Sequence, residues 1–201
     1  MKSTATLPDG YREILSVDLQ KNKKLALLVN GLALLIAAVM VTAYIIFGPS
    51  LEVYLILDNS ARGWTLNFPL VIVSLLIAGA GTLVYIILHE ATHGVFMYGF
   101  SRVKPRFGFT LMYAYAGSDA YFAKLPYIVI ALAPVILLGG VLLALNILLP
   151  TEYFLPVYFI QIMNISGAAG DFYVTARFIS MPKDILVRDT GVSMTVYSSE
   201  A

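Results

Sequence analysis

Residues 25–47 read LALLVNGLALLIAAVMVTAYIIF and contain no charged side chain. A helix of about 20 apolar residues crosses the roughly 30 Å hydrocarbon core of a bilayer, and this run is long enough to do so. Three more apolar runs follow at residues 68–88, 125–149 and 154–176, and only the last contains a charge, Asp171. We therefore expect an all-α membrane protein with four transmembrane helices.

The composition excludes an ordinary water-soluble protein. Of the 201 residues, 59% are hydrophobic and 12% are charged, and the mean hydropathy is +0.83. Soluble domains carry about 25% charged residues, and a soluble globule of this length cannot bury so much apolar surface. The absence of cysteine excludes disulfides and thiolate metal sites, and the net charge of +1 gives no reason to expect a nucleic-acid partner. One integral membrane domain over residues 1–201 is expected.

The basic residues predict the orientation in the membrane, because lysine and arginine are enriched in cytoplasmic loops. They lie before the first run, between the second and third runs, and after the fourth: Lys21, Lys23, Lys24, Arg102, Lys104, Arg106, Lys124, Arg177, Lys183 and Arg188. The other two connections hold one cation, Arg62, beside Glu52, Asp58 and Glu152. Both termini and the loop at 89–124 are therefore predicted to be cytoplasmic.

The segment at 103–116, VKPRFGFTLMYAYA, differs in periodicity from the four runs. Large apolar residues recur at every second position from Phe107 to Tyr115, which is typical of a strand. We expect a short strand or hairpin at the cytoplasmic membrane surface, and the alternative is an aromatic-rich interfacial loop. The polar tail after residue 180 is expected to be loosely held or packed on the same face.

Both histidines of the chain fall in one pentapeptide, His89-Glu90-Ala91-Thr92-His93. Residues four apart share one face of a helix, so the two imidazoles can bind one metal ion, as in the HExxH zinc motif. Glu90 points about 100° around the helix, where it can act as the base toward a zinc-activated water. The alternative is a pair of helix-end histidines, with Glu90 as a solvated carboxylate.

A catalytic zinc site has three protein ligands and one open position. With no cysteine and no third histidine, the remaining ligand has to be an oxygen. Asp171 is the leading candidate, because it is the only charged residue within the four runs and metal binding offsets the cost of burying it. The alternative for Asp171 is a hydrogen bond between helices or an ion pair with Arg177. Asn164 is expected to be a substrate-binding or second-shell residue.

The chain resembles the putative zincin peptidase family, a group of small four-span bacterial membrane proteins long catalogued as a domain of unknown function. More distantly, it is similar to the site-2 proteases, which are intramembrane zinc metalloproteases. The matching residues are Leu7-Pro8-Asp9-Gly10-Tyr11, His89-Glu90-Ala91-Thr92-His93-Gly94, Ala131-Leu132-Ala133-Pro134, and Asn164 through Asp171.

The resemblance implies zinc bound by His89, His93 and Asp171, with Glu90 as the general base. It also implies that the segment at 103–116 is a membrane-associated sheet with which an extended substrate pairs. The expected function is that of a zinc-dependent intramembrane or juxtamembrane metallopeptidase in the bacterial cytoplasmic membrane, acting on membrane or membrane-associated proteins. The alternative is a non-proteolytic zinc protein of the membrane, with a structural, transport or regulatory role.

Overall fold

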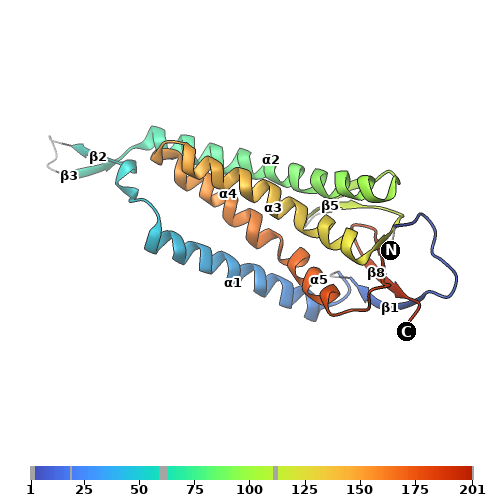
Figure 1. The fold of residues 1–201 in the computed structure, drawn as a ribbon. Helices are drawn as coiled ribbons and strands as arrows, with labels where there is room; N and C mark the ends of the chain where they lie inside the picture. The colour runs from blue at the N-terminus through green and yellow to red at the C-terminus, as the bar shows by residue number, and fades with distance from the viewer. Residues whose placement is uncertain (1–2, 19, 59–62, 111–112, 201) are drawn as a thin grey trace.

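The computed structural model describes residues 3–18, 20–58, 63–110 and 113–200. Within these ranges the chain forms five α-helices: α1 (Lys23–Phe47), α2 (Phe68–Ser101), α3 (Lys124–Leu148), α4 (Phe154–Gly167) and α5 (Ala169–Ile179). It also forms eight strands: β1 (Arg12–Val17), β2 (Leu55–Asp58), β3 (Gly63–Leu66), β4 (Arg106–Phe109), β5 (Ala114–Gly117), β6 (Tyr121–Ala123), β7 (Leu186–Asp189) and β8 (Met194–Ser198). Both termini lie at one end of the helix bundle, called here the termini end (Figure 1).

The helices form a bundle in which α4 packs against α1, α2 and α3. Among the described residues, α1, α2 and α3 are long and apolar enough to cross a membrane. Much of their apolar surface faces outward, since Leu34, Leu75 and Ile136 are 72%, 68% and 65% exposed. An exposed apolar surface of this extent fits contact with lipid rather than water.

The fourth predicted span, at 154–176, is not one continuous helix. It is divided at Ala168, whose backbone angles (φ −83°, ψ 14°) leave the helical range, into α4 and the shorter α5. Gly167 and Gly170 flank this break, and glycine is a poor helix former. The break makes α5 a separate helix with Asp171 in its first turn.

The second predicted span continues well beyond residue 88, because α2 ends only at Ser101. Asn67 caps its start by accepting a hydrogen bond from the backbone N–H of Leu70. At the other end, Arg102 takes the left-handed conformation that commonly terminates helices. His89 and His93 are therefore held inside a regular helix and not at its frayed end.

The expectation of an all-α protein with one short strand or hairpin is corrected by a four-stranded antiparallel sheet at the termini end, into which the tail after residue 180 is packed rather than loosely held. Its strand order is β1-β8-β7-β6, so both ends of the chain meet in one sheet. Phe122, Ile185 and Val196 of this region are fully buried against Phe178 of α5 in a single apolar core. Alternating burial along β8 (buried at Met194, Val196 and Ser198) has the period of a strand with one face covered.

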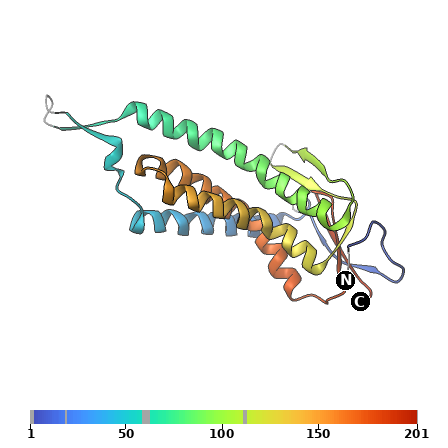
Figure 2. The ribbon, with the colours of Figure 1, turned by 45° about the horizontal axis from the view of Figure 1, so that its top comes forward.

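The predicted strand or hairpin at 103–116 is present as the antiparallel pair β4 and β5, beside the last turns of α2 (Figure 2). Leu111 and Met112 lie outside the described residues. Phe107 packs against Gly94 of α2, where a Cβ atom would approach its ring to 2.3 Å. Tyr115 pairs with Gly108, and residues paired across two strands share one face of a hairpin. Tyr115 therefore lies on the opposite face from Phe107, because the turn shifts the alternation of faces that one continuous strand would have.

A second hairpin, β2 and β3, joins α1 to α2 at the opposite end of the bundle (Figure 1). It was not expected from the sequence. We refer to this end as the hairpin end.

Candidate metal centre

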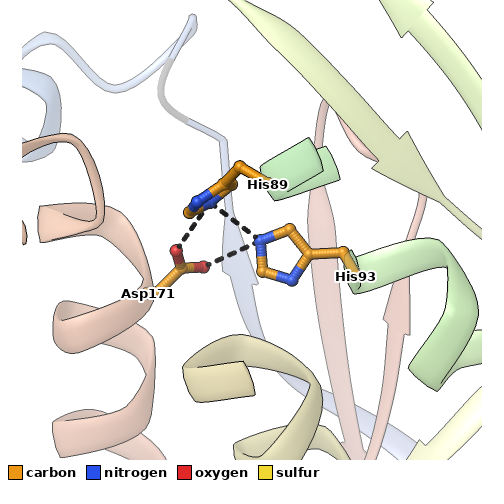
Figure 3. Close-up of side chains that lie close together, drawn as sticks. All are labelled: His89, His93 and Asp171. Carbon is orange, nitrogen blue, oxygen red and sulfur yellow. Dashed lines mark hydrogen bonds and ion pairs between the residues drawn. The ribbon is translucent and has the colours of Figure 1, made fainter. Parts of the chain in front are cut away.

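Three side chains from two helices point toward one another (Figure 3), and they line a cavity together with residues of β5 and β8 at the termini end. His89 and His93 lie one turn apart on α2, and their Nε2 atoms are 3.2 Å from each other. The Asp171 carboxylate reaches them from α5, with Oδ2 at 3.5 Å from Nε2 of His89 and Oδ1 at 3.8 Å from Nε2 of His93. The structure thus brings together the three residues that the sequence predicted as metal ligands.

The second ring nitrogen of His93, Nδ1, has a hydrogen-bond partner outside the cluster. Its Nδ1 lies 2.9 Å from the backbone carbonyl oxygen of Ile130 on α3. A carbonyl oxygen only accepts hydrogen bonds, so Nδ1 must carry the proton. In the neutral imidazole, Nε2 is then an unprotonated acceptor that faces His89 and Asp171.

The outer nitrogen of His89 has a partner that sequence reasoning missed. The Tyr85 hydroxyl lies 3.0 Å from Nδ1 of His89 and donates toward the backbone carbonyl oxygen of Asn164 at 3.5 Å. When the hydroxyl donates to that carbonyl it can accept from Nδ1–H of His89. When it donates to Nδ1 instead, the proton lies on Nε2 of His89 and can bridge to Nε2 of His93. Tyr85 precedes His89 by four residues, and that spacing on an apolar helix was the available signal.

The donor set fits a zinc ion. Two imidazole nitrogens and a carboxylate face one another, and these are ligand types that zinc takes in proteins. Ligand atoms around a tetrahedral zinc at 2.0–2.2 Å lie roughly 3.3–3.6 Å apart, close to the 3.2–3.8 Å between the nitrogens and carboxylate oxygens of His89, His93 and Asp171. Among the described residues, these three form the one cluster of histidine and carboxylate groups close enough to hold a metal.

Glu90 lies beside this cluster without belonging to it. Its carboxylate accepts a hydrogen bond from the backbone N–H of Ala116 on β5, and it lines the same cavity as the three ligand candidates. The cavity has a volume of about 460 Å³. A carboxylate held next to a metal site, and open to the same cavity, is placed to accept a proton from water.

Asn164 does not line the cavity, and its backbone carbonyl contacts Tyr85 rather than the candidate metal ligands. Its side chain is fully buried and points to α3, where Nδ2 donates to the carbonyl oxygen of Val135 at 3.4 Å. Gly139 permits this approach, since a Cβ there would lie 2.9 Å from Nδ2. Through its carbonyl, Asn164 contacts Tyr85 and so supports His89 indirectly.

The C-terminal segment contributes a cavity residue that sequence reasoning also missed. Asp189, at the end of β7, accepts hydrogen bonds from the Tyr127 hydroxyl at 2.5 Å and from the backbone N–H of Gly191 at 2.8 Å. Burial raises the pKa of its carboxyl above the usual range. No sequence pattern singles Asp189 out, because it reaches the cavity only through the pairing of β7 with β6 and β8.

A family model described as putative zincin peptidase matches residues 82–186. The chain belongs to this family. The matched region of the zincin peptidase family contains the two histidines, Glu90 and Asp171, and it ends before Asp189. No curated protein and no solved structure shows significant similarity to the chain.

Proposed function

We propose that this protein is a zinc-dependent membrane peptidase in which His89, His93 and Asp171 hold the metal. The observation that carries the proposal is the convergence of two imidazole nitrogens and one carboxylate, with N···N and N···O distances of 3.2–3.8 Å, beside a cavity. Membership of the zincin peptidase family supports the same chemistry. Three protein ligands leave one position open, as in catalytic rather than structural zinc sites.

Bound zinc would supply Lewis-acid polarisation of the substrate carbonyl and a water of lowered pKa. The role of Glu90 follows from its place next to that site. Its carboxylate takes the proton of the attacking water and can return it to the leaving amine of the cleaved peptide bond. The Ala116 N–H holds the carboxylate in position for this transfer.

Substrate would bind in an extended conformation in the cavity beside β5. The N–H groups of Ala116 and Ser118 point away from β4 and donate to the Glu90 carboxylate and, at 2.7 Å, to the Asp189 carbonyl oxygen. Ala114 to Ala116 line the cavity, and Ala116 faces Glu90. An extended peptide beside Ala114 would place its peptide bonds near Glu90, and a helical substrate would have to unwind first.

The membrane arrangement is part of the proposal. We propose that α4 and α5 together form the fourth crossing beside α1, α2 and α3, with the termini end in the bacterial cytoplasm. The lysines and arginines around the termini end support this orientation. Substrates would then be membrane or membrane-associated proteins cleaved near the cytoplasmic face, a mode of action similar to that of site-2 proteases.

The proposal is tested with purified, zinc-loaded protein in detergent micelles and a proteome-derived peptide library. New termini are identified by mass spectrometry for the wild type, Glu90→Gln and the matched control Glu152→Gln, which changes a glutamate at the hairpin end. Cleavage is expected for the wild type and the control, with a loss of at least about 100-fold in Glu90→Gln, since a positioned general base contributes about 10²–10⁴-fold.

Undiminished cleavage by Glu90→Gln contradicts the role of Glu90. Zinc-loaded wild type that cleaves no peptide contradicts the peptidase proposal and favours the non-proteolytic zinc protein. Zinc content of each variant is measured in parallel, and Glu90→Gln is expected to keep its metal because Glu90 is not among the ligands.

A further inference from the structure

Pro134 lies inside the long helix α3, where a proline removes one backbone hydrogen bond. In a regular helix the N–H of residue 134 would bond to the carbonyl oxygen of residue 130. Proline has no N–H, and its ring displaces that carbonyl from the helix axis. The carbonyl oxygen of Ile130 is therefore left without its helical donor at a position that is 1% exposed. A buried carbonyl without a partner costs free energy, so another donor is needed.

His93 is that donor. Its Nδ1–H reaches the Ile130 carbonyl oxygen across the α2–α3 interface at 2.9 Å, and the Tyr127, Ile130 and His93 side chains line one cavity. The bond sets the protonation of the imidazole, because a proton held on Nδ1 leaves Nε2 as the free ligand atom. Outer partners of this kind orient metal-binding histidines and raise their basicity.

We infer that Pro134 is a positioning residue for the metal centre: by leaving the Ile130 carbonyl free, it fixes His93 in the tautomer that binds zinc through Nε2. The inference rests on the proposed zinc site, and it adds a residue on α3 that does not line the cavity. Pro134 is almost fully buried in the bundle, so it acts through the backbone of its own helix.

The test compares zinc affinity, by chelator competition, in the wild type, Pro134→Ala and Pro126→Ala. An alanine at 134 restores the N–H that competes with His93 for the Ile130 carbonyl. Loss of an outer partner weakens metal binding by about 10- to 100-fold, so a loss of roughly 10-fold is expected in Pro134→Ala. Pro126 is the matched control, because it lies in the first turn of α3, where backbone N–H groups have no helical partner.

A further variant distinguishes the effect of the missing N–H from the effect of the bend that the proline ring imposes. The α-hydroxy counterpart of alanine, introduced at position 134 by nonsense suppression, has neither the ring nor the N–H. It is expected to bind zinc as tightly as the wild type. Zinc binding as weak as that of Pro134→Ala would overturn the inference, since the ring itself would then be what matters.

A measurement on the metal-free protein distinguishes this test from the test of the zinc site. With only two histidines in the chain, ¹⁵N-histidine NMR of the metal-free protein above pH 8 resolves the tautomer of each ring. The Nδ1–H tautomer of His93 is expected in the wild type and is expected to be depleted in Pro134→Ala. An unchanged tautomer and unchanged zinc affinity in Pro134→Ala would overturn the inference. Wild type that binds no zinc but shows the expected tautomers would refute the proposed function alone.

Discussion

Buried polar groups are paired in different ways at the two ends of the helix bundle. At the hairpin end, Tyr54 donates to the Glu152 carbonyl oxygen at 3.0 Å and shares a hydrogen bond with Ser74 at 3.2 Å, so each group has a partner of opposite kind. At the termini end, His89, His93 and Asp171 present acceptors to one another. The first arrangement pairs donors with acceptors, whereas the second gathers the ligand types that bind a metal ion.

This difference teaches how to distinguish a structural polar cluster from a functional one in an apolar protein. A structural cluster pairs donors with acceptors, because an unpaired buried polar group is costly. At the termini end, His93 instead donates from Nδ1 to the Ile130 carbonyl oxygen, which leaves its Nε2 free of a proton toward His89 and Asp171. Outer hydrogen bonds of this kind are typical of metal-binding histidines.

The largest expected effect contrasts the packing of the two ends. Phe178 is fully buried at the termini end and contacts Tyr127 with ring centroids 5.6 Å apart, whereas Trp64 on β3 is 62% exposed. Phe178→Ala is expected to lower the free energy of unfolding by about 3–5 kcal/mol, because it opens a cavity in the core. Trp64→Ala is expected to change it by less than about 0.5 kcal/mol. Reversible unfolding in mixed micelles measures both, and equal losses would contradict the assignment of the core.

A smaller effect is expected when the hydroxyl of one tyrosine is removed at each end of the bundle. Tyr85→Phe removes the partner of Nδ1 in His89, while Tyr54→Phe removes a comparable hydrogen bond at the hairpin end. Each is expected to cost roughly 1 kcal/mol of stability, but only Tyr85→Phe is expected to weaken zinc binding, by about 10-fold. Chelator competition measures the affinities, and a zinc affinity that is unchanged in Tyr85→Phe would show that Tyr85 does not support His89.

The smallest effect concerns a surface ion pair at the termini end. Hydrogen bonds from Arg188, together with the charge of Arg106, lower the pKa of the Asp119 carboxyl. Its contribution to stability is therefore present above the unfolded value of 3.8 and is lost as pH falls through the lower pKa of the folded state. We expect the difference in stability between the wild type and Asp119→Asn to shrink between pH 5 and pH 2. A stability difference that stays constant over this pH range would contradict a stabilising contribution of the Asp119 ion pairs.

Much of the bundle, and the convergence of His89, His93 and Asp171, could be predicted because both depend on local patterns. The charge-free runs mark α1, α2 and α3, and the spacing of His89 and His93 follows from helix geometry. Asp171 was predictable for a different reason, since a lone charge in an apolar run requires a partner.

The four-stranded sheet and the outer hydrogen bonds could not be predicted in the same way. β1 and β8 pair residues from opposite ends of the chain, and no local periodicity reports such a contact. The division between α4 and α5 depends on packing around small residues, to which hydropathy is insensitive. Tyr85 and Asp189 acquire their roles only from neighbours brought close by the fold.

The metal centre itself is tested most directly by the zinc content of protein purified without chelators. We predict about one zinc per chain for the wild type and a loss of bound zinc in His93→Ala and in Asp171→Ala, with Glu152→Ala at the hairpin end as the unaffected control. Equal zinc in the wild type, His93→Ala and Asp171→Ala would contradict the account. Loss in His93→Ala alone would place the third ligand elsewhere than Asp171.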